Sequence, residues 1–277
     1  MKALLKPVEL LYRGVNRLNR WLYRRGIRRA RRLPAPVVSV GNRAVGGAGK
    51  TPATIAIAGA LAARGLRVAV LTRGYGRSGT EQGPVTSLDT ARFGDEPVLI
   101  KSKLKNIDVI VGANRYENGA RVSADIFVLD DGFQHLRLAR DYDVVIEGPS
   151  RWYREGPSAL KDADAVLPRT LRVVGGERIR GRRVFAFSGL ANNEQFFTTV
   201  RNLEAIVTGT RGFADHHRYT PADLAALRQA ANGALLVTTE KDAVKIAPAD
   251  DIIPLAVEFV MHPSLIDDIL RRIGSHE

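Results

Sequence analysis

The sequence predicts an α/β fold with a mostly parallel sheet and flanking helices, a second, smaller α/β domain, and an N-terminal amphipathic basic helix. Short apolar, β-branched runs alternate with helical patterns through most of the chain, which is typical of buried parallel strands with helices on both faces of the sheet. A glycine-rich segment separates the first apolar run from the first helical pattern, and basic residues concentrate at the start of the chain.

The composition fits a globular chain and excludes several kinds of chemistry. With 277 residues, of which 45% are hydrophobic and 26% charged, the chain can bury a sizeable core. It contains no cysteine, so disulfides, iron–sulfur clusters, Cys-ligated zinc and thiol nucleophiles are excluded. The sequence has neither a run of about 18 apolar residues nor an opening signal-peptide pattern, and we therefore expect no membrane-spanning segment.

Residues 1–33 form the first predicted element, a basic amphipathic helix. The first 35 positions hold eleven Lys or Arg and one acidic residue, which leaves only +3 of the total charge of +13 to the rest of the chain. Apolar residues recur at helical spacing from Leu4 to Leu22, with arginines on the opposing side. Such a helix can lie in the plane of an anionic membrane, which is our preferred interpretation. Packing of the apolar stripe on the body and an arm that binds nucleic acid are the alternatives.

The body reads as a nucleotide-binding core domain over 34–178 and a smaller C-terminal α/β domain over 179–277, separated near a Gly-Gly pair. In the core domain we expect a helix from Thr51 to about Arg64 and strands over Val37–Val40, Val68–Leu71, Val109–Val111, Ile126–Leu129, Val144–Ile146 and Ala165–Leu167. In the smaller domain we expect helices over Pro221–Ala231 and Ser264–Arg272 and strands near Val184–Phe187, Ile206–Val207, Leu235–Val237 and Ile252–Val257.

The segment 41–52, GNRAVGGAGKTP, lies between a predicted strand and a predicted helix, where a phosphate-binding loop occurs. Glycines let backbone N–H groups turn toward an anion, and the helix N-terminus adds its positive dipole end. A lysine in the first helical turn opposes that dipole unless an anion neutralises it. A glycine turn that only caps the helix is the alternative. We predict a P-loop NTPase-like nucleotide site formed by Ala44, Val45, Gly46, Gly47, Ala48, Gly49, Lys50 and Thr51.

Two adjacent carboxylates, Asp130 and Asp131, follow the predicted strand at 126–129. Adjacent acids repel each other unless a cation or a donor is near, and the ligands of open α/β sheets lie beyond the carboxyl ends of the strands. A divalent cation bound to nucleotide phosphates would supply that charge. We predict a metal site here, shared with the hydroxyl of Thr51. A turn without any ligand is the alternative.

Three further clusters carry candidate chemistry. Asp95 opens a helical pattern, which it could simply cap. His216 lies beside a carboxylate in a loop, and such a pair is suited to take a proton from an alcohol. Because the adjacent His217 cannot easily face the same metal ion, we do not predict a zinc site. Arg73 and Tyr75 follow a predicted strand, where they contact an anionic or sugar substrate or form only a turn.

Together these motifs resemble the tetraacyldisaccharide 4′-kinase family of the lipid A pathway. The usual phosphate loop has an early glycine where Ala44 stands, and this family's loop lacks that glycine too. The segment before Arg154 is shorter than in the family, and Glu155 is followed by a glycine. The match follows the family's order over Ser39–Pro52, Arg73–Tyr75, Gly94–Pro97, Asp130–His135, Asp215–His216 and Thr238–Asp242.

The resemblance implies transfer of the γ-phosphate of ATP, with Mg²⁺, to the 4′-hydroxyl of a tetraacylated disaccharide 1-phosphate. It also implies a peripheral protein on the cytoplasmic face of the inner membrane, whose partners are the lipid disaccharide and the anionic membrane surface. Neither nucleic acid nor a protein partner is expected. Rival interpretations are a P-loop NTPase of the metal-chaperone or protein-targeting type, without a lipid acceptor, and an interaction protein with a degenerate nucleotide site.

Roles are carried over to single residues by matching the family's motifs. The implied catalytic residues are Asp95, His216, Asp131 and Lys50. The implied metal ligands are Thr51, Asp130 and Asp131. The implied substrate-binding residues are Arg73, Tyr75, Arg115, Arg154 and Glu155.

Overall fold

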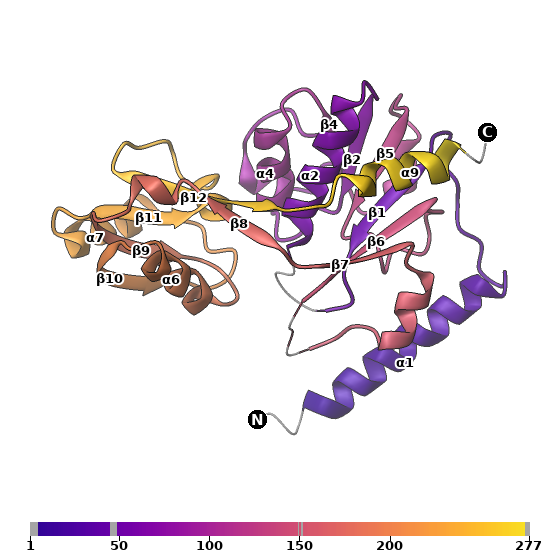
Figure 1. Ribbon diagram of the computed structural model, residues 1–277, viewed down its shortest axis with the longest axis horizontal. Coiled ribbons are helices and arrows are strands. Elements are labelled where there is room, and N and C mark those ends of the chain that lie inside the picture. Colours follow the sequence, from indigo (N-terminus) through magenta and orange to yellow (C-terminus); the bar gives the residue numbers. More distant parts are fainter. Residues whose placement is uncertain (1–4, 45–48, 149, 151, 275–277) are drawn as a thin grey trace.

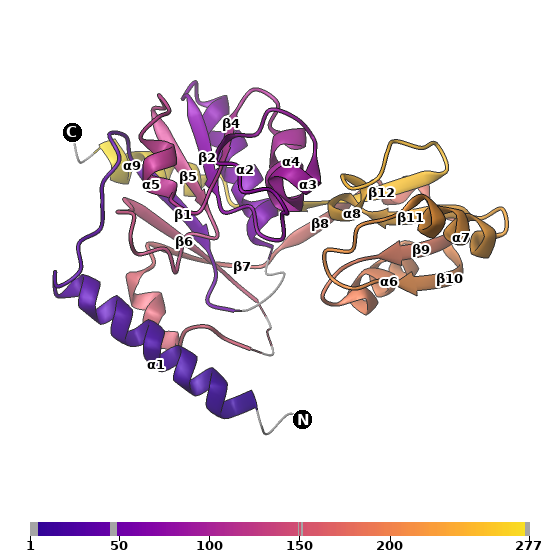
Figure 2. The ribbon, with the colours of Figure 1, turned by 180° about the vertical axis from the view of Figure 1, so that it is seen from behind.

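The computed structural model describes residues 5–44, 49–148, 150 and 152–274. In this part of the chain two sheets organise two lobes, which Figure 1 shows side by side and linked by the strands β8 (Leu171–Val174) and β12 (Ile252–Phe259). Figure 2 shows the same arrangement from behind, with the helix α1 (Leu5–Arg24) on the outside of the larger lobe. The predicted α/β fold class is confirmed.

The larger lobe contains a seven-stranded sheet in which neighbouring strands are parallel except for the edge pair β3–β4. The inner strands are buried on both faces, as their continuous apolar runs predict. The register pairs Val40 with Asp130, so the glycine loop and the two acids follow neighbouring strand ends. Across the sheet the strands are β3 (Gly83–Pro84), β4 (Asp108–Val111), β2 (Val68–Thr72), β5 (Ile126–Asp130), β1 (Val37–Gly41), β6 (Tyr142–Glu147) and β7 (Ala165–Pro168).

Helices cover both faces of this sheet. On one face, α2 (Lys50–Ala63), α4 (Asp95–Lys103) and α9 (Ser264–Gly274) share one apolar core with the strands. On the other face, Tyr116 of α5 (Arg115–Gly119) and the buried Leu33 pack in a second cluster. The short α3 (Thr90–Phe93) directly precedes α4. The strand ends that carry the predicted site therefore lie at the edge of a rigid, two-sided core.

The smaller lobe contains a five-stranded sheet that is parallel except for the pair β12–β8. Helix α6 (Asn193–Asn202) packs on one face through Phe196 and Phe197, and α7 (Pro221–Ala231) packs on the other through Leu227. The short α8 (Glu240–Ala243) follows β11. Across the sheet the strands are β10 (Ile206–Gly212), β9 (Arg183–Ser188), β11 (Leu235–Thr239), β12 and β8.

The expected division of the body at 178/179 differs from this arrangement at two points. Strand β8, which the division assigns to the core domain, pairs with β12 in the smaller sheet. Helix α9, which it assigns to the smaller domain, packs through Leu265, Ile266 and Ile269 on the larger sheet. The chain thus enters the smaller lobe before the Gly-Gly pair and returns through β12. Periodicity identified these elements but carried no information on which sheet each one joins.

Helix α1 presents its apolar side to solvent and its polar side to the body. Leu11, Val15 and Leu18 are 57–70% exposed, whereas Arg20 is buried against the short 3₁₀ helix η1 (Pro157–Asp162). This is the reverse of the packing alternative, in which the apolar stripe covers the body. Among the described residues, none of the helices combines the length and the apolar character that a membrane crossing requires.

Candidate active site

The beginning of α2 supplies the described half of the phosphate loop. The helix begins at Lys50, directly after Gly49, whose φ of 77° lies in the left-handed region that glycine adopts without strain. Ala44 forms an isolated antiparallel bridge with Tyr153. The other residues predicted to bind nucleotide, Val45, Gly46, Gly47 and Ala48, lie outside the described residues.

Asp130 lies buried at the end of β5, and the described part of the chain satisfies both of its carboxylate oxygens. Thr54 of α2 donates a hydrogen bond of 2.8 Å to Oδ1, and Thr72 of β2 donates one of 3.2 Å to Oδ2. Burial raises the pKa of Asp130 to about 7, helped by the neighbouring charges of Glu96 and Asp131. A cation near Asp130 would therefore favour the charged form of its carboxylate.

Asp131 has a different environment, although it is the next residue. Its φ of 51° turns the chain out of the strand, and its carboxylate lies 2.9 Å from Lys50 Nζ and 3.4 Å from Arg154 Nη1. Burial alone would raise the pKa of Asp131, but the charges of Lys50 and Arg154 outweigh it and hold the pKa below its usual value. Two adjacent acids thus have pKa values that shift in opposite directions.

The donor set at this corner fits a magnesium ion. Thr51 in the first turn of α2 and the carboxylates of Asp130 and Asp131 offer only oxygen, the ligand type of hard cations. No group of three or more His, Cys, Asp or Glu able to hold a metal occurs within the described ranges. A cation here would need phosphate oxygens and water to complete its shell, as Mg²⁺ in nucleotide sites commonly does.

The structure brings Asp95 and His216 together across the two lobes. Asp95 opens α4 in the larger lobe, and its Oδ2 lies 2.9 Å from Nδ1 of His216, which belongs to the loop between β10 and α7. The φ of His216 is 60°, in the left-handed region. The ring of Tyr75 lies 5.6 Å from that of His216. Residues 121 positions apart in the chain therefore form one pair.

The neighbouring His217 has another partner. Its Nε2 lies 3.1 Å from Oδ2 of Asp223 in the first turn of α7, and its ring stacks on Phe213. Thr220 and Asp223 form a capping box at the start of that helix. Residue chemistry alone did not distinguish the two histidines, and the motif match favoured His216; the geometry pairs His216 with Asp95.

Two lysines missed by the sequence analysis surround this pair. Lys241 Nζ lies 3.4 Å from His216 Nε2, and Lys245 Nζ lies 3.7 Å from Asp95 Oδ2. Lys245 is buried and also holds Asp242 at 2.6 Å. The two ring nitrogens of His216 thus face different groups, Nδ1 the carboxylate of Asp95 and Nε2 the ammonium group of Lys241. Lys241 lies within the motif Thr238–Asp242, for which no role was predicted, and Lys245 lies three residues beyond it.

The first three predicted substrate-binding residues differ in their exposure to solvent. Arg73 and Tyr75 are exposed in the loop after β2, where a ligand can reach them. Arg115 is buried at the start of α5, its Nη1 3.5 Å from Nδ1 of His135, and burial with the nearby charge of Arg73 lowers the pKa of Arg115. Burial and these arginines also lower the pKa of His135 to about 4, so its ring is neutral near pH 7.

Glu155 was predicted to bind substrate, but its side chain is buried against α1 instead. It is only 4% exposed, and both of its carboxylate oxygens accept hydrogen bonds from Arg20 of α1. The adjacent Arg154 does point toward the site, since its Nη1 lies 3.4 Å from Asp131 Oδ2 and from Gln134 Oε1. The two residues were predicted together, but only one of them faces the acids.

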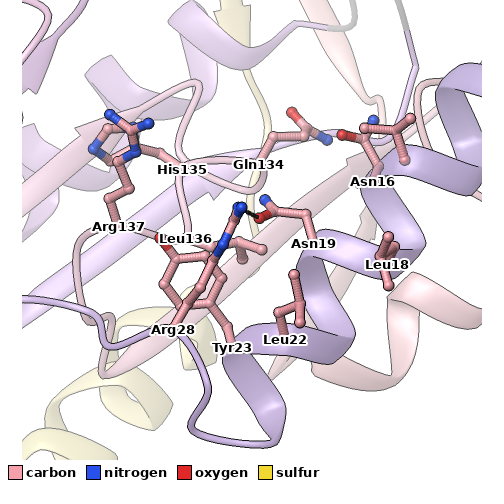
Figure 3. A pocket seen from close by; sticks show the side chains of 11 residues that line it. Asn16, Leu18, Asn19, Leu22, Tyr23, Arg28, Gln134, His135, Leu136 and Arg137 are labelled. Carbon is pink, nitrogen blue, oxygen red and sulfur yellow. Dashed lines mark hydrogen bonds between the residues drawn. The ribbon is translucent and has the colours of Figure 1, made fainter.

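A cavity of about 290 Å³ lies beside this corner, between α1 and the loop that follows Asp131. Figure 3 shows Leu18 and Leu22 of α1 on one side of it and His135 and Arg137 of the loop on the other. The lining thus combines apolar side chains with basic ones, and the cavity lies at the end of the exposed apolar side of α1.

Comparison with known proteins identifies the family. The family model described as tetraacyldisaccharide-1-P 4′-kinase matches residues 1–172 and 162–274. The chain is 41% identical to a tetraacyldisaccharide 4′-kinase of Anaeromyxobacter dehalogenans (strain 2CP-C), over 87% of this chain and 80% of that protein. It is 35% identical to the Geobacter metallireducens protein of the same name, over 96% and 94%.

A solved structure extends the likeness to three dimensions. The crystal structure of LpxK from Aquifex aeolicus in complex with ATP superposes with a TM-score of 0.79 at 27% identity, covering 98% of this chain and 99% of that one. The family model and the curated relatives each cover most of the chain in sequence, and this structure does so in fold. The chain therefore belongs to the tetraacyldisaccharide 4′-kinase family.

Proposed function

We propose that the chain catalyses the reaction for which its family is described, transfer of the γ-phosphate of ATP to the 4′-hydroxyl of a tetraacyldisaccharide 1-phosphate in lipid A synthesis. The proposal is carried by two groups that are linked through Glu96, which follows Asp95 in the chain and whose charge acts on Asp130. One is the corner of Lys50 and Asp131 beside the phosphate loop. The other is the pair formed by Asp95 and His216. Phosphoryl transfer needs this combination of charge neutralisation and a positioned base.

Lys50 and the loop would bind the phosphates. Lys50 Nζ lies 2.9 Å from Asp131 Oδ1, so the ammonium group is placed beside the acid that would hold the cation and could contact the transferring phosphate there. Gly49 and the remaining loop residues, including those outside the described ranges, would add backbone N–H groups to the same anion.

Thr51, Asp130 and Asp131 would hold Mg²⁺. When bound, the ion neutralises charge on the phosphate oxygens during transfer. The raised pKa of Asp130 supports this assignment, because a buried carboxylate that keeps its proton to about pH 7 gains most from a nearby cation.

Asp95 and His216 would orient the acceptor hydroxyl and take its proton. The Oδ2 atom of Asp95 lies 2.9 Å from Nδ1 of His216, and we assign the carboxylate, held by that ring, as the acceptor of the hydroxyl proton. Exposed Tyr75 offers a ring to the sugar, and Arg73 offers a cation to an anionic group of the acceptor. Arg115 and Arg154 are assigned to the substrate side of Asp131 on the same chemistry.

The exposed apolar side of α1 would bind the protein peripherally to an anionic membrane, at the cytoplasmic face of the inner membrane. Leu11, Val15 and Leu18 form a continuous exposed stripe, the side that an interfacial helix inserts. Part of the arm's positive charge is engaged within the protein, since Arg20 and Arg24 pair with Asp162. Apolar burial would therefore act together with the basic residues of the arm that remain exposed.

The decisive experiment is incubation with labelled ATP, Mg²⁺ and the disaccharide acceptor in mixed micelles. We expect labelled lipid whose formation needs all three components. Nucleotide hydrolysis without labelled lipid would overturn the proposal and favour a P-loop NTPase that works without a lipid acceptor.

A further inference from the structure

We infer that Arg20 of α1 is a positioning residue of the phosphotransfer site, which holds Arg154 beside Asp131. The inference rests on the proposed function and deepens it. In the sequence, Arg20 is one of the many arginines of a basic arm. In the structure its side chain is only 6% exposed, so it takes no part in a lipid-facing surface.

Four hydrogen bonds to protein acceptors hold the guanidinium of Arg20. Its Nε and Nη2 donate to the two oxygens of Glu155 at 3.0 and 2.9 Å. Its Nη1 donates to Asp162 at 2.9 Å, and its Nη2 also donates to the backbone carbonyl of Phe133 at 3.1 Å. The same group lies over the ring of Phe133, 4.4 Å from its centroid. This bidentate, planar recognition is specific to arginine.

The rest of the polar side of α1 contacts the same segment. Asn16 Nδ2 donates to the carbonyl of Arg154 at 2.8 Å, and Arg13 Nε donates to the carbonyl of Tyr153 at 3.3 Å. The amide of Tyr153 donates to Glu9 Oε1 at 3.2 Å. These side chains recur at spacings of three and four, so they share one face of the helix. Successive side chains on that face therefore form hydrogen bonds with successive residues of the segment 153–155.

Arg20 joins the two segments whose side chains meet at the site. Arg154 belongs to the segment that Arg20 holds through Glu155, and its Nη1 lies 3.4 Å from Asp131 and from Gln134. Asp131 and Gln134 belong to the loop that Arg20 holds through the carbonyl of Phe133. One buried guanidinium therefore ties the segment of Arg154 to the loop of Asp131, in addition to the backbone hydrogen bonds from Arg154 and Glu155 to the carbonyl of Arg43.

Removing this guanidinium would leave the carboxylate of Glu155 buried and without its cation. The segment would then shift toward water, and Arg154 would shift with it. A displacement of about 1 Å in a positioning group can lower turnover by as much as 10²-fold. The alternative is that Arg20 contributes only charge to the arm, in which case any arginine of α1 serves equally well. Exposed Arg17, one turn earlier, is the matched control.

The test is a mutant cycle on the full chain, measured in mixed micelles with ATP, Mg²⁺ and the acceptor. We expect Arg20→Met to lower kcat at least about tenfold more than Arg17→Met does, with the KM for ATP changed by less than about twofold. In an Arg154→Ala background, Arg20→Met should lower kcat by less than about threefold, because the group it positions is already absent. Arg20→Lys should fall between wild type and Arg20→Met.

Equal losses for the Arg20 and Arg17 variants, or the same loss with and without Arg154, would overturn the inference. If Arg20→Met does not fold, the cycle with Arg20→Lys decides on the same criteria. Hydrogen exchange of the amides at 152–156 gives a readout independent of turnover and should be faster in the Arg20 variants than in Arg17→Met. Wild-type protein that phosphorylates no acceptor would remove the proposed function, while the exchange rates would still decide whether Arg20 holds the segment.

Discussion

Replacing Asp130 by asparagine should change how the stability of the nucleotide-free protein depends on pH. The carboxylate is buried, with both oxygens accepting from threonine hydroxyls, and asparagine retains its shape. The native pKa is raised to about 7, while an aspartate in the unfolded chain titrates near 4. The native state therefore binds the extra proton between these values. This contribution to stability is fully present below pH of about 4 and is lost as the pH rises through about 7.

The magnitude follows from the size of the shift, about three pKa units. Since one unit corresponds to 1.36 kcal/mol, linkage over the interval from pH 5 to pH 8 gives a loss of about 2–3 kcal/mol. From pH 5 to pH 8 the free energy of unfolding of the wild-type protein should fall by this amount, and that of Asp130→Asn should not. Above pH 7 the variant should be the more stable of the two, because it no longer holds a buried charge.

The assay is urea denaturation at pH 5, 6, 7 and 8 without nucleotide and with a chelator present. Asp131→Asn is the matched control. The pKa of Asp131 is lowered, so the stability it contributes is present above the unfolded pKa and is lost only as the pH falls through the lower native value. Between pH 5 and pH 8 that variant should keep most of the wild-type pH dependence, reduced somewhat because the charge of Asp131 also helps to raise the pKa of Asp130. Parallel profiles for wild type and Asp130→Asn would refute the assigned burial energy.

The remaining predictions concern turnover, membrane binding and a helix cap. Asp95→Ala and His216→Ala should each lower kcat by about 10²-fold or more while changing ATP affinity by less than about threefold; near-normal kinetics in both would remove the pair from catalysis. Leu11→Glu with Val15→Glu should lower sedimentation with anionic vesicles about tenfold at an unchanged melting temperature, and undiminished sedimentation would contradict the assigned surface. Thr220→Ala removes the capping hydroxyl of α7 and should cost about 1 kcal/mol in chemical denaturation; no measurable loss would speak against the cap.

Most elements of the fold could be predicted because their signals are local. The run at 126–129 is apolar and short, and together with Asp130 it forms β5 in the interior of the sheet. The helix predicted from Thr51 begins one residue earlier, at Lys50. Membership of the two sheets could not be predicted in the same way. Strand β8 pairs with β12, whose partner residues stand more than 80 positions later in the chain, and no local pattern records such a pairing.

The same distinction between local and long-range information applies to the candidate site. The glycine loop and the two adjacent acids are local motifs, and the register of β1 and β5 puts them side by side. The opposite pKa shifts of Asp130 and Asp131 were not foreseeable, because they depend on threonines and on Lys50 from other elements. The burial of Arg20 was equally hidden, since its partner Glu155 lies 135 positions away.

Near-neighbour patterns alone predicted the α/β class, the phosphate loop, the acidic strand end and the amphipathic arm, and these motifs together resembled a known family. Only folding decided that His216 rather than His217 meets Asp95, that α1 turns its apolar side outward, and that one arm arginine lies inside the protein. The physical reason is that periodicity and turn chemistry act over a few residues, whereas these pairings depend on how distant segments pack against each other.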